Sequence, residues 1–201
     1  MHISEGILSW QVLAGGGVLA LAGTAAGLKN LEEYKMARTG MLSAAFFVAS
    51  LIHIPLGPAS VHLILNGLLG LLLGWAAFPA ILVALLLQAV LFQYGGITTL
   101  GVNTVIMAGP AVMCYYLYRL GHGLVPSGRY SWRFVTAGVC GALAILGSAL
   151  LAAAALFFTE EKFFEIAVLI VGAHGPVMVV EGLIAGFALT FFQKVKPALL
   201  S

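Results

Sequence analysis

The chain alternates long apolar runs with short polar breaks, and this pattern predicts a bundle of membrane-spanning helices. The apolar runs cover about 8–28, 40–53, 61–76, 79–94, 103–118, 134–158 and 164–192. A helix needs ~20 apolar residues to cross the hydrocarbon core, so a chain of this length has room for roughly six or seven spans and no separate soluble domain. We therefore expect an all-α integral membrane protein, a seven-helix transmembrane bundle in which residues 1–201 form a single domain.

Two of these runs leave the local topology open. Runs 61–76 and 79–94 are short for full spans, and almost no loop joins them. They fit either two short or tilted helices packed inside the bundle or a re-entrant hairpin. Both arrangements leave the orientation of every later helix unchanged, and we favour the two helices.

Composition supports the membrane assignment. Hydrophobic residues make up 62% of the chain and charged residues only 8%, whereas about 25% are charged in a typical soluble domain. The first run has no positively charged segment before it and is long enough to span, so we expect a retained helix rather than a cleaved signal. Cys114 and Cys140 lie inside apolar runs and are expected to be small core residues. No clustered basic face suggests nucleic acid.

The positive charges predict an orientation. If the N-terminus faces outward, one basic residue, Lys162, lies outside, and eight lie inside: Lys29, Lys35, Arg38, Arg119, Arg129, Arg133, Lys194 and Lys196. Cytoplasmic loops of membrane proteins carry the excess of Lys and Arg. The sequence therefore predicts an outer N-terminus and a cytoplasmic C-terminus.

The first two residues, Met1 and His2, form a candidate metal chelate. A side chain as bulky as histidine at position 2 normally blocks removal of the initiator methionine, which leaves the Met1 amine free. That amine, the backbone nitrogen of His2 and its imidazole Nδ1 can close two fused chelate rings around one ion. Ni(II) and Cu(II) accept such a planar nitrogen set readily, whereas tetrahedral Zn(II) disfavours it. We expect this N-terminal loop to fold back and become buried in the bundle.

His62 is the candidate for the fourth donor. It lies at the outer end of the third predicted element, after a stretch at 55–58 that two prolines and a glycine make a turn. His53 ends the second predicted helix at the same face. A neutral imidazole suits the remaining position of a planar tridentate site.

Further polar residues within or beside the apolar runs are candidates for a supporting role around the ion: His53, Asn66, Gln88, Asn103, His174 and Glu181. Ionisable groups at membrane depth usually face the bundle interior. His174 and Glu181 are seven residues apart and so share one helix face. An interhelical hydrogen-bonded pair is favoured over a proton relay, and Glu181 alternatively clasps a neighbouring helix.

Small residues recur at four-residue spacing in the pairs Gly23/Gly27, Ala45/Ala49 and Ser148/Ala152. Such pairs let two helices approach closely. They fit internal packing and a docking face for another membrane subunit equally well.

Four segments together carry a family resemblance: Met1-His2-Ile3-x-Glu5-Gly6; His62 with Gly67-Leu68; Gln88-Ala89 leading to Gly95-Gly96-x-Thr98-Thr99-Leu100-Gly101-x-Asn103-Thr104; and His174-x-Pro176 with Glu181-Gly182. In these the chain resembles the nickel/cobalt-binding membrane subunit (NikM/CbiM), the S component of energy-coupling-factor (ECF) transporters. The resemblance covers most of the chain. It implies seven helices around a buried N-terminal loop and a square-planar nitrogen site, with Met1, His2 and His62 as ligands.

The segment around His62 departs from the polar Cys-Ser-His-Pro-Thr-Gly stretch of cobalt-type members, because this chain reads Ala59-Ser60-Val61-His62-Leu63-Ile64. This departure favours nickel over cobalt. The resemblance also implies a multi-pass protein of the prokaryotic cell membrane.

The expected function is substrate capture for an ATP-driven importer of Ni(II) or Co(II), not catalysis. No Walker sequence occurs, so we expect partner subunits to hydrolyse the ATP. The resemblance implies that these partners are a transmembrane coupling (T) subunit and two ATPase subunits, with a small accessory membrane subunit as an optional addition. No cofactor is expected besides the transported ion. Two alternatives remain: a stand-alone secondary transporter or channel, which would need more polar groups along a continuous path, and an intramembrane metalloenzyme, which lacks a His-Glu-x-x-His motif.

Overall fold

The computed structural model describes residues 2–51, 53–56, 59–123 and 130–195, without the side chains of 53–56, 59–61, 122, 123, 130 and 161. Met1 and the middle of the predicted turn, residues 57–58, therefore lie outside the described residues.

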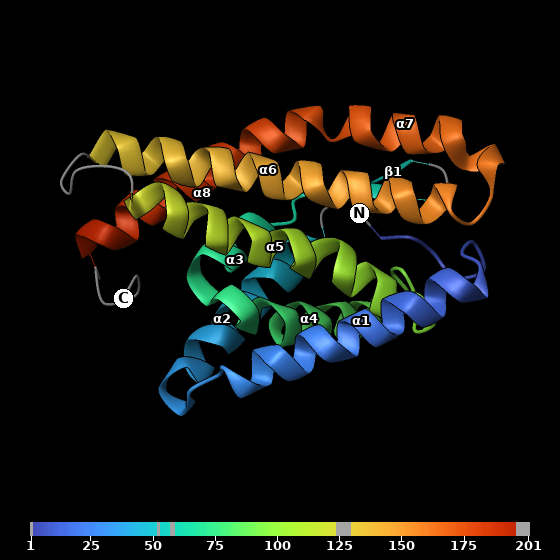
Figure 1. The fold of residues 1–201 in the computed structure, drawn as a ribbon, viewed down its shortest axis with the longest axis horizontal. Helices are drawn as coiled ribbons and strands as arrows, with labels where there is room; N and C mark the ends of the chain where they lie inside the picture. Colours follow the sequence, from blue (N-terminus) through green and yellow to red (C-terminus); the bar gives the residue numbers. More distant parts are fainter. Residues whose placement is uncertain (1, 52, 57–58, 124–129, 196–201) are drawn as a thin grey trace.

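The described fold is a helical bundle with one small strand hairpin, which lies at the same end of the bundle as the N-terminal segment (Figure 1). The long helices are α1 (Trp10–Lys29), α2 (Met36–Ala49), α4 (Ala77–Phe92), α5 (Leu100–Gly123), α6 (Tyr130–Phe157) and α8 (Gly175–Val195). Shorter elements are α3 (Asn66–Leu73), α7 (Phe164–Ala173) and the single turns η1 (Glu33–Lys35), η2 (Gly74–Ala76) and η3 (Glu161–Phe163). Strands β1 (His53–Leu56) and β2 (Ala59–His62) form an antiparallel pair.

Five stretches in the described part of the chain are long and apolar enough to cross a membrane: Trp10–Lys29, Asn66–Phe92, Leu100–Gly121, Ser131–Phe157 and Phe164–Val195. The chain is thus a multi-pass membrane protein. Helix α2, with 14 residues, is shorter than these stretches, and α3 has only 8. The seven-span count and the orientation stay predictions.

The described fold is nearly all helical, as predicted, and the hairpin is the departure from that prediction among the described residues. The predicted helices 40–53 and 61–76 lose residues to it, because α2 ends at Ala49 and α3 begins only at Asn66. In the hairpin His53 pairs with His62 and Leu56 with Ala59. Pro55 has no backbone N–H and cannot extend a helix, but the free edge of a two-stranded ladder tolerates it.

The last apolar run is also interrupted. A single helix over 164–192 was predicted, whereas the chain forms α7 and α8, which meet at His174. Pro176 explains the break, since proline lacks the N–H that a continuing helix requires and fits the first turn of a new one.

Helix α3 lies at the centre of the bundle, where every residue from Asn66 to Leu72 is buried against α5, α6 and α8. A Cβ on Gly70 would lie 2.0 Å from the backbone oxygen of Ala111, so glycine is needed for α3 and α5 to approach this closely.

Most of the small-residue pairs pack against other helices inside the bundle. A Cβ on Gly23 would clash with Phe78, and one on Gly27 with Pro79, so both pack α1 against α4. Ser148 and Ala152 on α6 are buried, whereas Ala45 on α2 is exposed.

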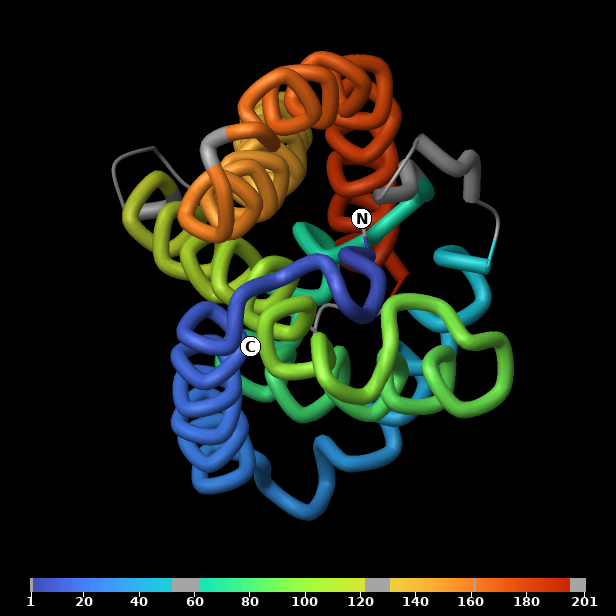
Figure 2. The backbone as a smooth tube through the Cα atoms, turned by 90° about the vertical axis from the view of Figure 1, so that its right-hand side faces the viewer, coloured from blue at the N-terminus to red at the C-terminus, as the bar shows by residue number. Residues whose placement is uncertain are grey.

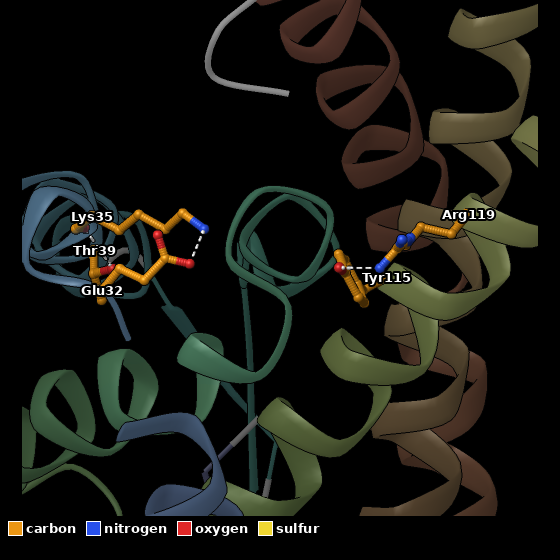
Figure 3. Close-up of polar contacts among 5 residues, drawn as sticks. All are labelled: Glu32, Lys35, Thr39, Tyr115 and Arg119. Carbon is orange, nitrogen blue, oxygen red and sulfur yellow. Dashed lines mark hydrogen bonds and ion pairs between the residues drawn. The ribbon is translucent and has the colours of Figure 1, made fainter. Parts of the chain in front are cut away.

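The two ends of the bundle differ in charge. The end of the bundle at which α8 ends also carries η1, between α1 and α2, the last turn of α5 and the first turn of α6, at the left in Figure 1. There Glu32 pairs with Lys35 at 3.2 Å, and the Arg119 guanidinium donates to the Tyr115 hydroxyl at 2.8 Å (Figure 3). The Thr39 hydroxyl donates to the Lys35 carbonyl in the same view. Figure 2 looks at the opposite end, across which the N-terminal segment runs toward the middle of the bundle.

Candidate metal centre

The N-terminal segment is fixed deep in the bundle. Ile3 is fully buried, and Asn103 on α5 binds both of its backbone polar groups. The Ile3 N–H donates to Asn103 Oδ1 at 3.0 Å, and Asn103 Nδ2 donates to the Ile3 carbonyl at 3.1 Å. The Asn103 amide thus bonds to the Ile3 backbone as a neighbouring β-strand would, and this fixes the position of the preceding residue, His2.

The connection between α4 and α5 makes a second set of hydrogen bonds to the N-terminal segment, at Glu5. The Glu5 N–H donates to the Gly95 carbonyl at 3.0 Å, while Glu5 Oε1 accepts from the Thr98 N–H at 3.0 Å and its hydroxyl at 3.3 Å. The Thr98 backbone donor lowers the pKa of the exposed Glu5 carboxyl. Gly96, at φ +140°, lies directly against Glu5, where a Cβ would be 1.9 Å from Glu5 Cγ.

Gln88 on α4 fixes the imidazole of His2. The Nε2 of His2 lies 2.7 Å from Gln88 Oε1, and both residues are buried. An amide oxygen only accepts, so the ring carries its proton on Nε2 and its lone pair on Nδ1. Nδ1 is the nitrogen that a chelate with the N-terminal amine requires.

The amide of Gln88 is itself oriented from α2. Its Nε2 donates to the Phe47 carbonyl at 3.2 Å and to the Ser50 hydroxyl, which bonds in turn to the Phe46 carbonyl at 2.7 Å. These acceptors leave only the oxygen of Gln88 to face His2. Sequence reasoning missed Ser50, although its place between an apolar helix and a proline turn marked it as a polar group near the site.

His62 lies beside His2, with ring centroids 4.7 Å apart and planes at 30°. Its Nδ1 lies 2.9 Å from the Leu63 carbonyl, which only accepts, so this ring carries its proton on Nδ1 and its lone pair on Nε2. Nε2 is buried and has no hydrogen-bond partner among the residues that the structure describes. Burial, with the nearby His2 and His174, lowers the pKa of His62 well below its ordinary value, which keeps the ring neutral.

Glu181 on α8 holds the segment that follows His62. Its buried Oε1 accepts from the N–H groups of Ile64 and Leu65 at 2.5 and 2.7 Å. Leu65 has φ 56°, an uncommon left-handed conformation for a non-glycine residue, and these two hydrogen bonds support it. Glu181 clasps a neighbouring segment, as one reading of the sequence predicted, and no hydrogen bond joins it to His174 in the described part of the chain.

The remaining candidates lie at different distances from His2. Asn66 donates to the Met107 carbonyl at 3.0 Å and to the Ser148 hydroxyl at 2.8 Å, so it joins α3 to α5 and α6 and does not contact His2. The side chain of His53 is outside the described residues, and its backbone pairs with His62. Tyr94, which sequence reasoning did not single out, places its ring 6.4 Å from that of His2.

His2 and His62 are the two imidazoles that the described structure places side by side at this position. Within residues 2–195, as far as they are described, no three His, Cys, Asp or Glu side chains converge on one point. A metal ion at His2 and His62 would need donors other than a third side chain of these types, and the backbone and the N-terminus can supply nitrogen. The cysteines do not contribute, because Cys114 and Cys140 are buried free thiols between α5 and α6.

Comparison with known proteins identifies the family. The profile "CbiM: Cobalt uptake substrate-specific transmembrane region" matches residues 2–199. The chain belongs to the CbiM family. It is a membrane component of nickel or cobalt uptake.

Full-length and fused relatives agree with this. The "Putative metal transport protein" of Haemophilus influenzae is 42% identical over 202 residues, which cover 100% of this chain and 97% of the relative. The "Cobalt transport protein CbiM" of Sorangium cellulosum is 29% identical and is covered to 94% by the whole chain. The "Fused nickel transport protein NikMN" of Rhodobacter capsulatus is 37% identical over 68% of this chain, which spans 40% of that longer protein.

A solved structure shares the fold. The crystal structure of a transition metal transporter superimposes with a TM-score of 0.85 at 28% identity, covering 97% of this chain and 93% of that one. The overall fold of this CbiM-family chain therefore matches that of a solved transition metal transporter.

Proposed function

We propose that this CbiM-family chain captures Ni(II) or Co(II) for an ATP-driven ECF-type importer in a square-planar site of four nitrogens. The Met1 amine, the deprotonated backbone nitrogen of His2 and His2 Nδ1 supply three, and His62 Nε2 supplies the fourth. The proposal takes Met1 as the first residue of the mature chain, which mass spectrometry of the protein checks.

The observation that carries this proposal is the complementary protonation of two adjacent rings. The ring centroids of His2 and His62 lie 4.7 Å apart. The His2 ring N–H donates to Gln88 Oε1, and the His62 ring N–H donates to the Leu63 carbonyl. Outer hydrogen bonds of this kind orient metal-binding imidazoles and fix their tautomers. A purely structural His62 would gain stability by bonding through both of its ring nitrogens, since its buried, unsatisfied Nε2 costs free energy.

Partner subunits are the second part of the proposal. These 201 residues contain no Walker sequence, and the proposal therefore assigns ATP hydrolysis to partner subunits. Relatives named as fused transport proteins, NikMN and CbiMQ, support an assembly with further membrane subunits. We propose a transmembrane coupling subunit and two ATPase subunits.

The site is tested by calorimetric titration of the native chain with Ni(II). His2→Ala and His62→Ala should each abolish high-affinity binding, because each removes one nitrogen from a planar set that nothing else in the described bundle replaces. His122→Ala is the matched control, since it deletes an imidazole from the opposite end of α5. Retained high affinity in both His2→Ala and His62→Ala would refute the site.

A further inference from the structure

A single peptide group connects Glu181 on α8 to the candidate ligand His62. The carbonyl of Leu63 accepts from His62 Nδ1 at 2.9 Å. The N–H of Ile64, at the other end of the same peptide group, donates to Glu181 Oε1 at 2.5 Å. A peptide group is planar, so fixing its N–H also fixes the direction of its C=O. The carboxyl group of Glu181 therefore sets the direction of the acceptor that orients the His62 ring.

No helix or strand holds this peptide group. Strand β2 ends at His62 and α3 begins at Asn66, so residues 63–65 lie between regular elements. Two successive backbone N–H groups of this segment donate to Glu181 instead, and the carboxyl group itself is buried. Buried backbone donors need a partner of this kind. The conformation of the segment therefore depends on a side chain that is more than a hundred residues further along the chain.

The buried ring of His174 shows the contrast. Its Nδ1 donates to the Ile170 carbonyl at 2.6 Å, and that carbonyl belongs to helix α7. The regular dihedral angles of the helix fix this acceptor without outside help. The acceptor of His62 lacks such support and obtains it from Glu181.

Helix α8 holds Glu181 at a close crossing with α6. A Cβ on Gly182 would lie 2.8 Å from the carbonyl oxygen of Gly138, and a Cβ on Gly141 would lie 3.2 Å from the carbonyl oxygen of Glu181 itself. These glycines let the two helix backbones approach each other. The position of α8 against α6 thus determines where the Glu181 carboxyl group lies.

We propose that Glu181 is a positioning residue for the metal centre, through which the position of α8 controls His62 as a ligand. This inference rests on the proposed function. While Glu181 holds the peptide group, the Leu63 carbonyl keeps the proton on His62 Nδ1 and leaves Nε2 as the donor nitrogen. A displacement of α8 breaks the bonds to the segment, lets the peptide group rotate and removes the fixed orientation of the ring. Movement of α8 is then a route to metal release.

The test is calorimetric titration of the full chain with Ni(II). Glu181→Leu removes the acceptor at similar volume and should lower the affinity by about 10- to 100-fold, the usual loss for a group that orients a metal ligand. Glu181→Gln keeps an acceptor oxygen for the two N–H groups and should retain most of the native affinity. In a His62→Ala background, Glu181→Leu should cause no further loss of the weak binding that remains, because it acts only through that ring.

A second pair of variants moves α8 and leaves Glu181 in place. Gly182→Ala puts a Cβ 2.8 Å from the Gly138 oxygen, so α8 must shift away from α6, and Ni(II) affinity should fall several-fold. Gly175→Ala is the matched control, because it is the same change on the same helix with nothing within 4 Å, and it should bind like the native chain. Thermal unfolding of every variant checks that the bundle is folded.

Each contrary result overturns a different statement. Native affinity in Glu181→Leu, or an equal further loss when it is added to His62→Ala, would overturn the positioning role of Glu181. Native affinity in Gly182→Ala would overturn the control by α8. A native chain that fails to bind Ni(II) tightly would instead overturn the N-terminal centre itself.

Discussion

At the residue scale, the two proposed ligands His2 and His62 are oriented by neighbouring atoms that are not themselves proposed as ligands. Gln88 selects Nδ1 of His2 as the unprotonated nitrogen, and the Leu63 carbonyl selects Nε2 of His62. The sequence named both histidines and Gln88 as candidates. It did not reveal that Gln88 faces His2, because the two are 86 residues apart and only the packing of α4 beside the N-terminal segment brings them together.

Replacing Gln88 by leucine tests this selection. Gln88→Leu removes the acceptor of the His2 N–H while keeping a similar volume, so the imidazole loses its fixed tautomer and orientation. We expect Ni(II) affinity to fall by about 10- to 100-fold, the usual effect of losing such a supporting group. Calorimetric titration measures it, with Gln11→Leu at an exposed position of α1 as the same chemical change elsewhere. Equal affinities for the two variants would show that Gln88 does not support the site.

At the element scale, the α4–α5 connection packs against the N-terminal segment and holds it in place through Glu5. Gly95, at φ +75°, and Gly96 adopt conformations that favour glycine, and the space beside them is filled by Asn103 and Glu5. The connection can therefore lie flat against the segment. The motif Gly95-Gly96-x-Thr98 thus has a steric explanation: the glycines make room and the threonine supplies two donors to Glu5.

Gly96→Ala should weaken the contact between the α4–α5 connection and the N-terminal segment. A Cβ there would lie 1.9 Å from Glu5 Cγ and would occupy a backbone conformation that L residues rarely adopt. We expect Glu5 to be displaced and Ni(II) affinity to fall several-fold, with the helical content seen by circular dichroism unchanged. Gly40→Ala in α2, where nothing lies within 4 Å, is the control and should bind like the native chain. Native affinity in Gly96→Ala would contradict a positioning role for this connection.

The helices were predicted more closely than their interruptions. Hydropathy located the apolar runs that contain the helices, because lipid-facing and core residues are equally apolar. The sequence predicted a turn at 55–58 but not the pairing of the strands on either side of it. It also missed the break at His174, which lies within an apolar run. Backbone constraints at Pro55, Leu65 and Pro176 decide these features. For the same reason the sequence extended 61–76 as a helix where the chain enters α3 only at Asn66.

At the scale of the whole molecule, charge separates the two ends of the bundle. Glu160 and Lys162 pair with one another at the end that carries the N-terminal segment. The opposite end carries most of the positive side chains, among them Lys35 and Arg119 in Figure 3. With a cytoplasmic C-terminus this distribution satisfies the positive-inside rule and places the buried candidate centre toward the outer side.

Thiol labelling in intact cells tests this orientation. In a Cys114→Ala/Cys140→Ala background no native thiol remains. Glu160→Cys and Glu32→Cys then place single thiols at side chains of matched exposure, 51% and 54%, at opposite ends of the bundle. A membrane-impermeant maleimide should label the first in intact cells and the second only after permeabilisation. The reverse pattern would place the metal centre on the cytoplasmic side.

The central claim is that the chain's own N-terminus is a ligand, and an extension of that terminus tests it most directly. Two alanines ahead of Met1 move the amine away from His2, whereas a single alanine would make His2 the third residue and create a different four-nitrogen chelate. Mass spectrometry verifies the new terminus, and the same two residues added at the C-terminus are the control.

Titration with Ni(II), followed by calorimetry and visible absorption, is the measurement. The native chain and the C-terminal control should bind one ion tightly and give the yellow, diamagnetic signature of planar Ni(II), and the N-terminally extended chain should lose both. An extended chain that binds Ni(II) with native affinity and native colour would contradict the account.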